Sequence, residues 1–485
     1  MKRKALSMVL ASAMTLSMIA GCGGSGADTA TTTNETTEAT ETTETTESTD
    51  AAETTESTDA AETTEESTDA AAEETEAPTA DVSSEGEHEL SVYAWDKNFN
   101  IPALQAAEKA YQTVDPDFKL NIIEQSASSD VENAVTLAAN SGDYSQLPDI
   151  VLFQDHYIQN YVTNYPDAWI DLEDAGIDWS NLGAEKISYS TIDGKHYGAP
   201  VDNGTSIFAY RTDILEECGY TIDDVTGITW DRWLEIGREV KEKTGKYLLS
   251  MDHNGDDLPY MMMQAEGLSQ WKDGQPYFVG NEDLKKILQV IITGAQDGVI
   301  YLCNDWSEYT DTSIIGDQVA GVFNGNWIIP TMEQNAEASG KWQITTIPTL
   351  SGKEGYAANG GSSLYITANC TKPELAKSFL AYTFGGGDGA IATYDDALRN
   401  GGVIGTCISA SKSDVYQEGV DFFNGQSIYA DIVAMGANVP VVEQSDYHYN
   451  ARTYIQAAIT NVINGSDLDT ELQNAEDQVK FEMGQ

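Results

Sequence analysis

Between residues 89 and 155, short apolar runs alternate with longer amphipathic runs, and this order constrains the fold more than any other feature of the chain. The short runs are typical of β-strands, and the longer ones have apolar residues at helical spacing. They follow one another as ELSVYAW, PALQAAEKAYQTV, FKLNIIEQ, VENAVTLAAN and LPDIVLFQD. Strand, helix, strand, helix, strand is the order of a parallel sheet with helical crossovers. The sequence therefore predicts an α/β fold.

The remainder of the chain continues to mix the two kinds of element. YGAPVDNGTSIFAYRTDIL (197–215) is typical of a strand-like crossing into a helix-rich region. We predict that region from TWDRWLEIGREVKEKTG, DLKKILQVIITGAQDG and VAGVFNGNWIIPTMEQNAE. Strands return at WQITTIPTL and SSLYITAN, before the helical PELAKSFLAYTF. About 400 residues exceed a usual single core, so we expect two α/β lobes that the chain crosses between more than once.

The first 22 residues have the layout of an export signal. Lys2, Arg3 and Lys4 precede the apolar run ALSMVLASAMTLSMIA, which is short for a membrane span and ends in small residues. Residues 1–21 are therefore predicted to be a signal peptide. Ile19-Ala20-Gly21-Cys22 resembles the bacterial lipobox, which implies a diacylglycerol on Cys22 and a lipid anchor at the outer face of a bacterial, Gram-positive, cell membrane. The alternative is an ordinary cleavage site with a chance cysteine.

A low-complexity acidic tract follows the cysteine, over residues 22–86. Its repeats, such as TTESTDAAETTESTDAAETTEESTDAA, contain almost no large apolar side chains. Such a segment cannot bury enough surface to offset chain entropy, so we predict a disordered, self-repelling linker. At roughly 5 to 6 Å times the square root of its length, it would span several tens of ångströms. Its role would be to hold the folded part away from the membrane.

The net charge limits the partners that the folded part can bind. The formal charge of the chain is −54, and residues 23–89 carry 21 acidic and no basic residues. Since the first four residues carry three basic ones, residues 90–485 hold 58 acidic and 22 basic residues, a net −36. This sign argues against nucleic acid or anionic lipid, because phosphate binding needs clustered Lys and Arg. Neutral and cationic small molecules remain.

Metal sites are not predicted. Four cysteines besides Cys22 lack zinc spacing, and we expect buried free thiols, with one disulfide as the alternative: Cys218, Cys303, Cys370 and Cys407. The run MDHNGDDL offers four oxygen-bearing side chains, Asp252, Asn254, Asp256 and Asp257. It lacks the twelve-residue loop and terminal Glu of an EF-hand, so we interpret it as a surface loop. No cofactor is expected.

Several stretches resemble one known family when their order and spacing are taken together. They are LPDIVLFQD, YGAPVDNGTSIFAYRTDIL followed by TWDRW, VAGVFNGNW, and IPTLSGKEGYAANGGSSLYITANCTKPELAKSFLAY. Across residues 88–485 the chain is similar to the extracellular solute-binding proteins (family 1) of sugar ABC transporters, which include maltose-binding protein. The resemblance implies a two-lobe, periplasmic-binding-protein-like fold of type II, with a ligand cleft between the lobes. It places the N-lobe at 87–204 plus 345–402 and the C-lobe at 205–344 plus 403–485.

The resemblance also implies a function. A monomeric protein would capture a sugar or oligosaccharide outside the cell and deliver it to the transmembrane permease of an ABC transporter, without covalent chemistry. Closely related patterns accommodate different glycans, so the sugar itself is left open. Transfer of maltose specificity is weakened, because a tyrosine-containing stretch stands where maltose-binding protein has a tryptophan.

Candidate ligand-binding residues follow partly from position and partly from the resemblance. In open α/β sheets, ligands bind at the carboxyl ends of strands, which here carry Trp95, Asp96, Glu124, Gln125 and Asp155. Matching to the family adds residues of the crossing segments and second lobe: Asp202, Asn203, Tyr260, Trp306, Trp327, Gly361, Ser362, Tyr447 and Tyr449. Aromatic rings pack on the C–H faces of a pyranose, and carboxylates and amides bond its hydroxyls.

Other interpretations compete with this one. The Met run beside Tyr260 equally predicts a buried helix, and five other tryptophans are predicted to serve packing: Trp169, Trp179, Trp230, Trp233 and Trp342. A glycoside hydrolase would need a carboxylate pair at a set separation, and an abundance of acids is no such pair. A surface glycan-binding adhesin would not need a closable cleft. A polyamine- or peptide-binding protein of the same fold stays open because the folded part is acidic.

Overall fold

The computed structural model describes residues 82, 84, 86–97, 99–253, 255 and 257–485. The predicted signal peptide, Cys22 and nearly all of the acidic linker lie outside the described residues. Within the described part of the chain, no helix is both long and apolar enough to cross a bilayer.

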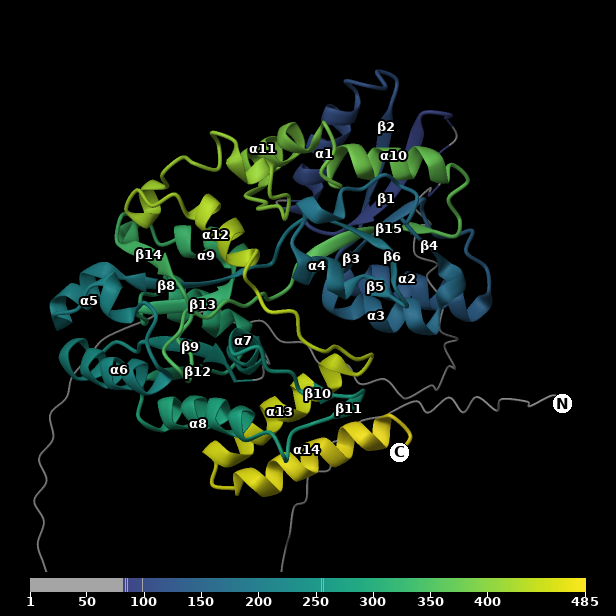
Figure 1. Ribbon diagram of the computed structural model, residues 1–485. Coiled ribbons are helices and arrows are strands. Elements are labelled where there is room, and N and C mark those ends of the chain that lie inside the picture. The colour runs from purple at the N-terminus through teal and green to yellow at the C-terminus, as the bar shows by residue number, and fades with distance from the viewer. Residues whose placement is uncertain (1–81, 83, 85, 98, 254, 256) are drawn as a thin grey trace, which may run out of the picture. The chain divides into compact units, whose positions relative to one another are not determined.

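A six-stranded sheet forms the centre of the first lobe (Figure 1). Its strands are β1 (Glu89–Ala94), β2 (Lys119–Glu124), β3 (Ile150–Gln154), β4 (Trp169–Ile170), β7 (Gly198–Pro200) and β15 (Ser362–Thr367). They run in the order β2-β1-β3-β15-β4, and β7 also pairs with β15. Val92 of β1 lies opposite Ile122 and Ile150 in parallel ladders, whereas β15 runs antiparallel to its neighbours. The predicted parallel arrangement is confirmed for β1, β2 and β3.

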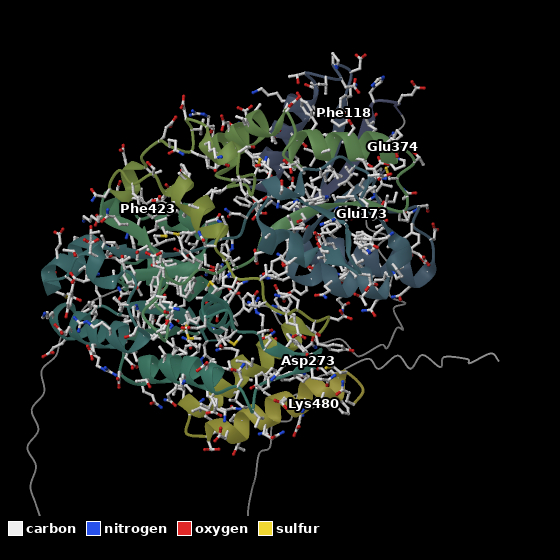
Figure 2. All side chains as sticks on the ribbon, viewed as in Figure 1. Phe118, Glu173, Asp273, Glu374, Phe423 and Lys480 are labelled. Atoms are coloured by element: carbon white, nitrogen blue, oxygen red, sulfur yellow. The ribbon has the colours of Figure 1, made fainter. Side chains whose placement is uncertain are left out.

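Helices cover both faces of this sheet. One face carries α1 (Asn100–Tyr111), α10 (Pro373–Thr383) and α11 (Ala390–Gly401), and the other carries α2 (Ser128–Ser141) and α3 (Asp155–Asn164) (Figure 1). Phe118, labelled in Figure 2, is fully buried, and its ring stacks on Phe379 at 5.1 Å and meets the edge of Tyr111 at 4.7 Å. Burying side chains of this size contributes about 1.5 to 3 kcal/mol each. These rings therefore fix α1 and α10 to one another.

The second lobe is built on a smaller antiparallel sheet. β8 (Ser206–Arg211) lies between β13 (Gly321–Gly325) and β14 (Trp342–Thr345), and β9 (Leu249–Asp252) pairs in parallel with β12 (Ile300–Cys303). The ring of Phe208 stacks on Tyr210 at 4.4 Å and on Phe323 at 4.9 Å. The indole of Trp233 donates a hydrogen bond to the Tyr210 hydroxyl at 3.0 Å. The core of this lobe is thus largely aromatic.

The helices of the second lobe surround these strands. They are α5 (Thr212–Cys218), α6 (Trp230–Thr244), α7 (Asp257–Ala265), α8 (Glu282–Gln296), α9 (Ile329–Glu333), α12 (Ile428–Gly436), α13 (His448–Ile463) and α14 (Leu468–Glu482). α6 begins where the Thr229 side chain accepts a hydrogen bond from the Arg232 amide, and it ends at Gly245, whose φ of 76° suits a glycine cap. Its buried face includes Trp230 and Trp233, so the predicted packing role of these tryptophans is confirmed.

Short elements complete the fold. α4 (Ala184–Tyr189) follows the first lobe's β4, and two small antiparallel hairpins join β5 (Thr191–Ile192) to β6 (Lys195–His196) and β10 (Trp271–Lys272) to β11 (Gln275–Pro276). A π-helical segment spans Glu308–Ile315.

The chain passes between the two lobes in three stretches, which lie after β7, before β15 and after α11. The first two run side by side: Thr205 and Ala358 form an antiparallel bridge, and the Asn359 amide donates to the Gly204 carbonyl at 2.7 Å. The predicted boundaries 204/205 and 402/403 fall in the first and third stretches, whereas 344/345 falls at the end of β14. As exact domain limits, these boundaries stay a prediction.

One predicted element is wrong. We expected VAGVFNGNWIIPTMEQNAE to belong to a run of helices, but Gly321–Gly325 forms the buried strand β13. Val322 and Phe323 pair with β8 in the centre of an aromatic core, and pairing of this kind overrides a weak local helical pattern. Only the later residues form a helix, α9, which Pro330 opens in its first turn.

The cysteines and the acidic loop can also be compared with expectation. All four described cysteines are buried free thiols, as expected, and no group of metal-ligating side chains is found in the described ranges. Asn254 and Asp256 of the MDHNGDDL run lie outside the described residues. The remaining predicted packing tryptophans are buried, apart from Trp179, which is partly exposed and stacks on His196 at 4.1 Å.

Candidate functional site

A cavity of about 480 Å³ is lined by both lobes and by the segments that cross between them. The first lobe contributes Trp95, Asp96, Phe99, Asn100, Gln154 and Gly401. The crossing segments contribute Asp202, Asn359, Gly360 and Gly361, and Ser362 opens β15 beside them. The second lobe contributes Asp257, Trp327, Pro330 and Tyr449. A molecule in this cavity would therefore touch both lobes at once.

The first lobe places its residues through the ends of its strands. Trp95 and Asp96 follow β1, and Gln154 is the last residue of β3. Because β1 and β3 are parallel neighbours, their carboxyl ends open at the same edge of the sheet. The Asp96 backbone amide donates a hydrogen bond to the side-chain oxygen of Asn100 in α1, at 3.1 Å. The first turn of α1 is thereby fixed against the β1 loop.

The second lobe supplies an aromatic wall. Trp327 lies two residues after the end of β13, and its indole N–H donates to the Asn359 carbonyl at 2.9 Å, which ties the ring to the return crossing. A Cβ on Gly325 would lie 2.2 Å from that indole nitrogen, so the approach of the ring requires glycine there. The Trp306 ring lies 5.8 Å from Trp327 and stacks on Tyr309 at 5.0 Å. The two indoles are neighbours with their planes 43° apart, and Trp327 is the one that lines the cavity.

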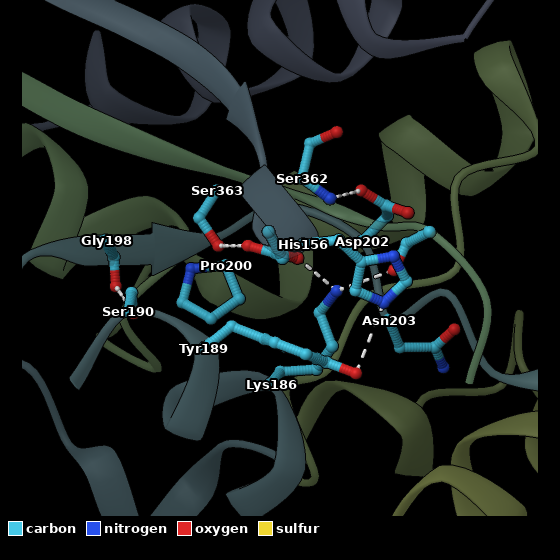
Figure 3. Close-up of polar contacts among 12 residues, drawn as sticks. His156, Lys186, Tyr189, Ser190, Gly198, Pro200, Asp202, Asn203, Ser362 and Ser363 are labelled. Atoms are coloured by element: carbon cyan, nitrogen blue, oxygen red, sulfur yellow. Dashed lines mark hydrogen bonds and ion pairs between the residues drawn. The ribbon is translucent and has the colours of Figure 1, made fainter. Parts of the chain in front are cut away.

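A buried group of charged side chains lies against the crossing segments (Figure 3). Lys186 of α4 forms an ion pair with Asp155 and donates to the Gly360 carbonyl at 3.3 Å. The Asp155 carboxylate also accepts from the Ser363 hydroxyl at 2.5 Å. Asp202 accepts from the Ser362 amide at 2.8 Å, as Figure 3 shows. Asp202 faces the cavity, whereas Asp155 is held within the wall.

Burial changes the ionisation of this group. Burial raises the pKa of Asp202 to about 6, an effect that Lys186 opposes and Asp155 strengthens. Burial also raises the pKa of Glu185. For Lys186, burial disfavours the ammonium, but the neighbouring carboxylates Asp155, Asp202 and Glu185 outweigh it and raise the pKa. The cavity therefore contains a carboxyl group that changes charge in the mildly acidic range.

A tight turn at Gly360 and Gly361 brings backbone atoms to the cavity. Their φ angles of 78° and 97° lie in the left-handed region that favours glycine. A Cβ on Gly361 would lie 1.9 Å from the Lys186 ammonium nitrogen, and one on Gly204 would lie 2.4 Å from the Gly360 carbonyl oxygen.

Tyr449, at the start of α13, reaches across to the first lobe. Its ring stacks on Tyr157 of α3 with centroids 4.0 Å apart and planes 9° apart, and its hydroxyl lies 3.0 Å from His156 Nδ1. Burial and the charge of Arg452 hold the pKa of His156 well below its ordinary value, so the ring is neutral at pH 7. These contacts join the two lobes next to the cavity, which Tyr449 lines.

The structure brings together half of the residues that the sequence singled out. The cavity is lined by Trp95, Asp96, Asp202, Trp327, Gly361, Ser362 and Tyr449. Trp306 lines a smaller cavity of about 40 Å³ that shares Asp257 with the main one.

The other candidates lie away from the cavity. Glu124 is the last residue of β2 and Gln125 follows it. Because β2 is an edge strand separated from β3 by β1, neither residue lines the cavity. Asn203 is buried in the crossing, where its side-chain oxygen accepts from the Asn326 amide at 2.6 Å. Tyr447 packs against the core of the second lobe.

Tyr260 and Asp155 are also buried rather than lining. The Tyr260 hydroxyl lies 3.0 Å from that of Tyr189, within the buried helix that the Met run equally predicted. Asp155 opens α3, and its carboxylate is taken up by Lys186 and Ser363. The residue of this strand end that lines the cavity is Gln154, one position earlier.

Several residues that line the cavity were not predicted from the sequence. Phe99 and Asn100 carry a weak signal, because they open the helix after the first strand. Asp257 is missed since the run around it is typical of a surface loop, but it opens α7 and accepts from Arg452 at 2.7 Å. Asn359 precedes the glycine turn, so its position follows from the crossing rather than from any local motif.

The arrangement suits recognition of a polyhydroxylated, partly apolar molecule. Trp95, Phe99 and Trp327 offer aromatic surface, and Asp96, Asp202 and Asp257 offer carboxylate acceptors. Rings pack on apolar C–H surface, and charge-assisted hydrogen bonds to hydroxyls fix orientation. Amide groups of Asn100, Gln154 and Asn359 can both donate and accept.

Comparison with known proteins places the chain in a family. The family model for bacterial extracellular solute-binding proteins matches residues 103–423. The chain belongs to this family.

Particular relatives agree with this placement. A lactose-binding protein of Rhizobium radiobacter is 32% identical over 395 residues, which are 80% of this chain and 92% of the relative. An arabinooligosaccharide-binding protein of Halalkalibacterium halodurans is 24% identical over 282 residues, covering 55% of this chain and 61% of the relative.

Solved structures show the same fold. An extracellular solute-binding protein of family 1 superposes with a TM-score of 0.68 at 18% identity, covering 81% of this chain and 99% of that chain. The ABC transporter associated binding protein from B. animalis subsp. lactis, solved with β-1,6-galactobiose, gives 0.62 at 19% identity, covering 81% of this chain and 98% of that chain. The predicted two-lobe, periplasmic-binding-protein-like fold is confirmed.

Proposed function

We propose that the protein captures a sugar or oligosaccharide outside the cell and delivers it to the permease of an ABC transporter. The observation that carries the proposal is the cavity of about 480 Å³, in which tryptophans and carboxylates come from both lobes. A cavity of this size suits a small ligand buried on most sides. The names of the sugar-binding relatives support the same class of ligand.

The mechanism is closure of two lobes on the ligand. Contacts with Trp95 and Asp96 on one side and with Trp327 on the other are made together only when the lobes are close. A ligand shifts the population toward the closed form by the difference in its affinity for the two forms. The permease then recognises the outer surface of the closed, monomeric protein. Binding involves no covalent chemistry.

The location follows from the N-terminal residues. Residues 1–21 direct export, and the thiol of Cys22 carries a lipid that anchors the protein at the outer face of a Gram-positive cell membrane. The acidic segment 22–86 links this anchor to the two lobes, whose limits are 87–204 plus 345–402 and 205–344 plus 403–485.

A thermal-shift panel tests the ligand class. The purified protein is heated with neutral mono- and oligosaccharides, with spermidine and with a mixed peptide digest. We expect one saccharide class to raise the melting temperature in a concentration-dependent way, since a ligand that binds only the folded state stabilises it. A shift with spermidine or peptides alone would overturn the sugar assignment and leave the binding-protein fold in place.

A further inference from the structure

Lys186 contacts the cavity wall without lining the cavity itself. It lies in α4, is 2% exposed, and extends toward Asp202 and the strand end at Ser362 (Figure 3). Its ammonium forms an ion pair with Asp155 and donates to the Gly360 carbonyl at 3.3 Å. Packing beneath the turn is so close that a Cβ on Gly361 would lie 1.9 Å from its nitrogen. One buried cation therefore touches the backbone that forms part of the cavity wall.

The two aspartates beside Lys186 have different hydrogen-bond partners. The Asp155 carboxylate is bonded to Lys186 and to the Ser363 hydroxyl, and its backbone amide donates to the Gly361 carbonyl at 3.1 Å. Asp202 instead accepts from the Ser362 amide at 2.8 Å and lines the cavity. Asp155 thus stabilises the cavity wall, whereas Asp202 lines the cavity and is placed to contact a ligand.

The charge of Lys186 opposes the burial of Asp202. Burial raises the pKa of Asp202 to about 6, and the carboxylate of Asp155 raises it further, while Lys186 lowers it. Other ionisable groups nearby are Glu185, Tyr394 and, among the residues that line the cavity, Asp96 and Asp257. Glu185, Asp96 and Asp257 are acids, and the Tyr394 hydroxyl is neutral because burial raises its pKa well above the ordinary value. Among these groups, Lys186 is the cation.

We propose that Lys186 is a positioning residue of the binding site, whose ammonium holds the Gly360–Gly361 turn in place and keeps Asp202 as the carboxylate that accepts ligand hydroxyls. This inference rests on the proposed function for the role of Asp202 in binding. It gives the site a dependence on pH, because protonated Asp202 loses its strongest acceptor capacity. Affinity is then retained at neutral pH through a side chain that never touches the ligand.

The first test needs no saccharide. The pKa of the Asp202 carboxyl is raised from 3.8 to about 6 in the folded state. Its ionisation therefore lowers the free energy of unfolding progressively as the pH rises from about 4 to about 6, and the whole of this loss applies at higher pH. The melting temperature of each protein is therefore measured from pH 4 to pH 9 relative to its Asp202→Asn partner. For the wild type we expect this difference to level off just above pH 6. In the Lys186→Met background we expect it to keep changing for about one further pH unit, a tenfold change in the ionisation constant.

Controls separate charge from packing. Lys186→Arg keeps a cation, so its melting-temperature difference should level off at the same pH as in the wild type. Lys195→Met removes an exposed ion pair with Asp171 and should leave that pH unchanged. Because Lys186→Met leaves Asp155 buried without its cation, the double variant Lys186→Met/Asp155→Asn is measured as well. If the melting-temperature difference levels off at the same pH with and without Lys186, the proposal is overturned.

The second test measures binding of lactose by isothermal titration at pH 6, 7 and 8.5. We expect Lys186→Met to bind about fivefold more weakly than the wild type at pH 6, about twofold more weakly at pH 7, and equally well at pH 8.5, which a loss of structure alone would not allow. Weakening that is equal at every pH would contradict the proposal. If the wild type does not bind lactose, the same titration with β-1,6-galactobiose and maltotriose replaces it. Failure of all three would count against the proposed function, while the saccharide-free melting data would still decide the coupling of Lys186 to Asp202.

Discussion

At the scale of single residues, the aromatic and acidic side chains of the cavity have separable roles. Trp327 supplies ring surface and is held in place by its bond to the Asn359 carbonyl. Asp202 supplies an acceptor that is costly to bury as a carboxylate. The first should matter for affinity at every pH, and the second only where it is ionised.

Replacing Trp327 by alanine should weaken saccharide binding by about 10- to 100-fold, since both stacking and the ordered wall are lost. Trp327→Phe should retain part of the affinity because a ring remains. Isothermal titration measures both. Trp179→Ala is a matched control, because Trp179 is a partly exposed tryptophan that stacks on His196 outside the cavity. Equal losses in the Trp179 and Trp327 variants would contradict the assignment.

Asp202→Asn should stabilise the protein at pH 7 while it weakens binding. The pKa of Asp202 in the folded state is about 6, above the ordinary 3.8. Ionisation of this carboxyl therefore lowers the free energy of unfolding, and the full reduction applies above pH 6. An uncharged amide avoids this cost, and we expect a gain of about 1 to 3 kcal/mol in the free energy of unfolding. Urea denaturation at pH 4 and pH 7 checks it. A variant less stable than the wild type at pH 7 would show that the carboxylate is favourable where it is buried.

Much of the site at this scale follows from the sequence. Trp95 and Asp96 follow a strand that the sequence predicts, and the family resemblance indicates Trp327. Asp155 and Tyr260 show why other residues do not follow. Whether a side chain at a strand end faces the cavity or the wall depends on a partner elsewhere in the chain, here Lys186 and Tyr189, which no local pattern specifies.

At the scale of elements, the order of strands decides which ends share an edge. β1, β2 and β3 are each predicted from sequence, but their lateral order is not. Because β2 lies at the edge, Glu124 and Gln125 are removed from the cavity. β15 enters the sheet beside β3 after the chain has built the second lobe, and it brings the Gly360–Gly361 turn to the site. Long-range pairing of this kind is beyond a reading of local periodicity.

Gly361→Ala should destabilise the protein and weaken binding together. Its φ of 97° is unfavourable for alanine, and the new Cβ would lie 1.9 Å from the Lys186 nitrogen. We expect a cost of about 1 to 3 kcal/mol in unfolding free energy. Gly142→Ala, at a helix end with φ 70° and open space around it, is the matched control and should cost less and leave binding unchanged. Equal costs at both positions would show that the turn is not tightly packed.

At the scale of the whole molecule, a predicted lipid anchor at the N-terminus precedes two lobes with a cavity between them. The two-lobe fold is predicted from composition, element order and resemblance together. The crossing segments are foreseen as well, although the strand at Gly321–Gly325 was expected to be helical. The lipid anchor stays a prediction, because residue 22 lies outside the described part of the chain.

Cys22→Ala should release the protein from the membrane. If the thiol carries the lipid, the variant loses its anchor and appears in the medium or the soluble fraction, whereas the wild type stays with membranes. Fractionation followed by immunoblotting measures the distribution, with Cys218→Ala as a control at a buried thiol. Wild-type and Cys22→Ala protein found in the same fraction would contradict the anchor.

Isothermal titration with the saccharide class that gives the largest thermal shift shows whether a saccharide binds between the two lobes. We expect saturable binding with one site per chain, loss of affinity in Trp327→Ala and no change in Trp179→Ala. Absence of binding with every saccharide, or saccharide binding that Trp327→Ala leaves intact, would contradict a saccharide site between the lobes. Binding of spermidine or peptides in their place would assign the same cavity to a different cargo.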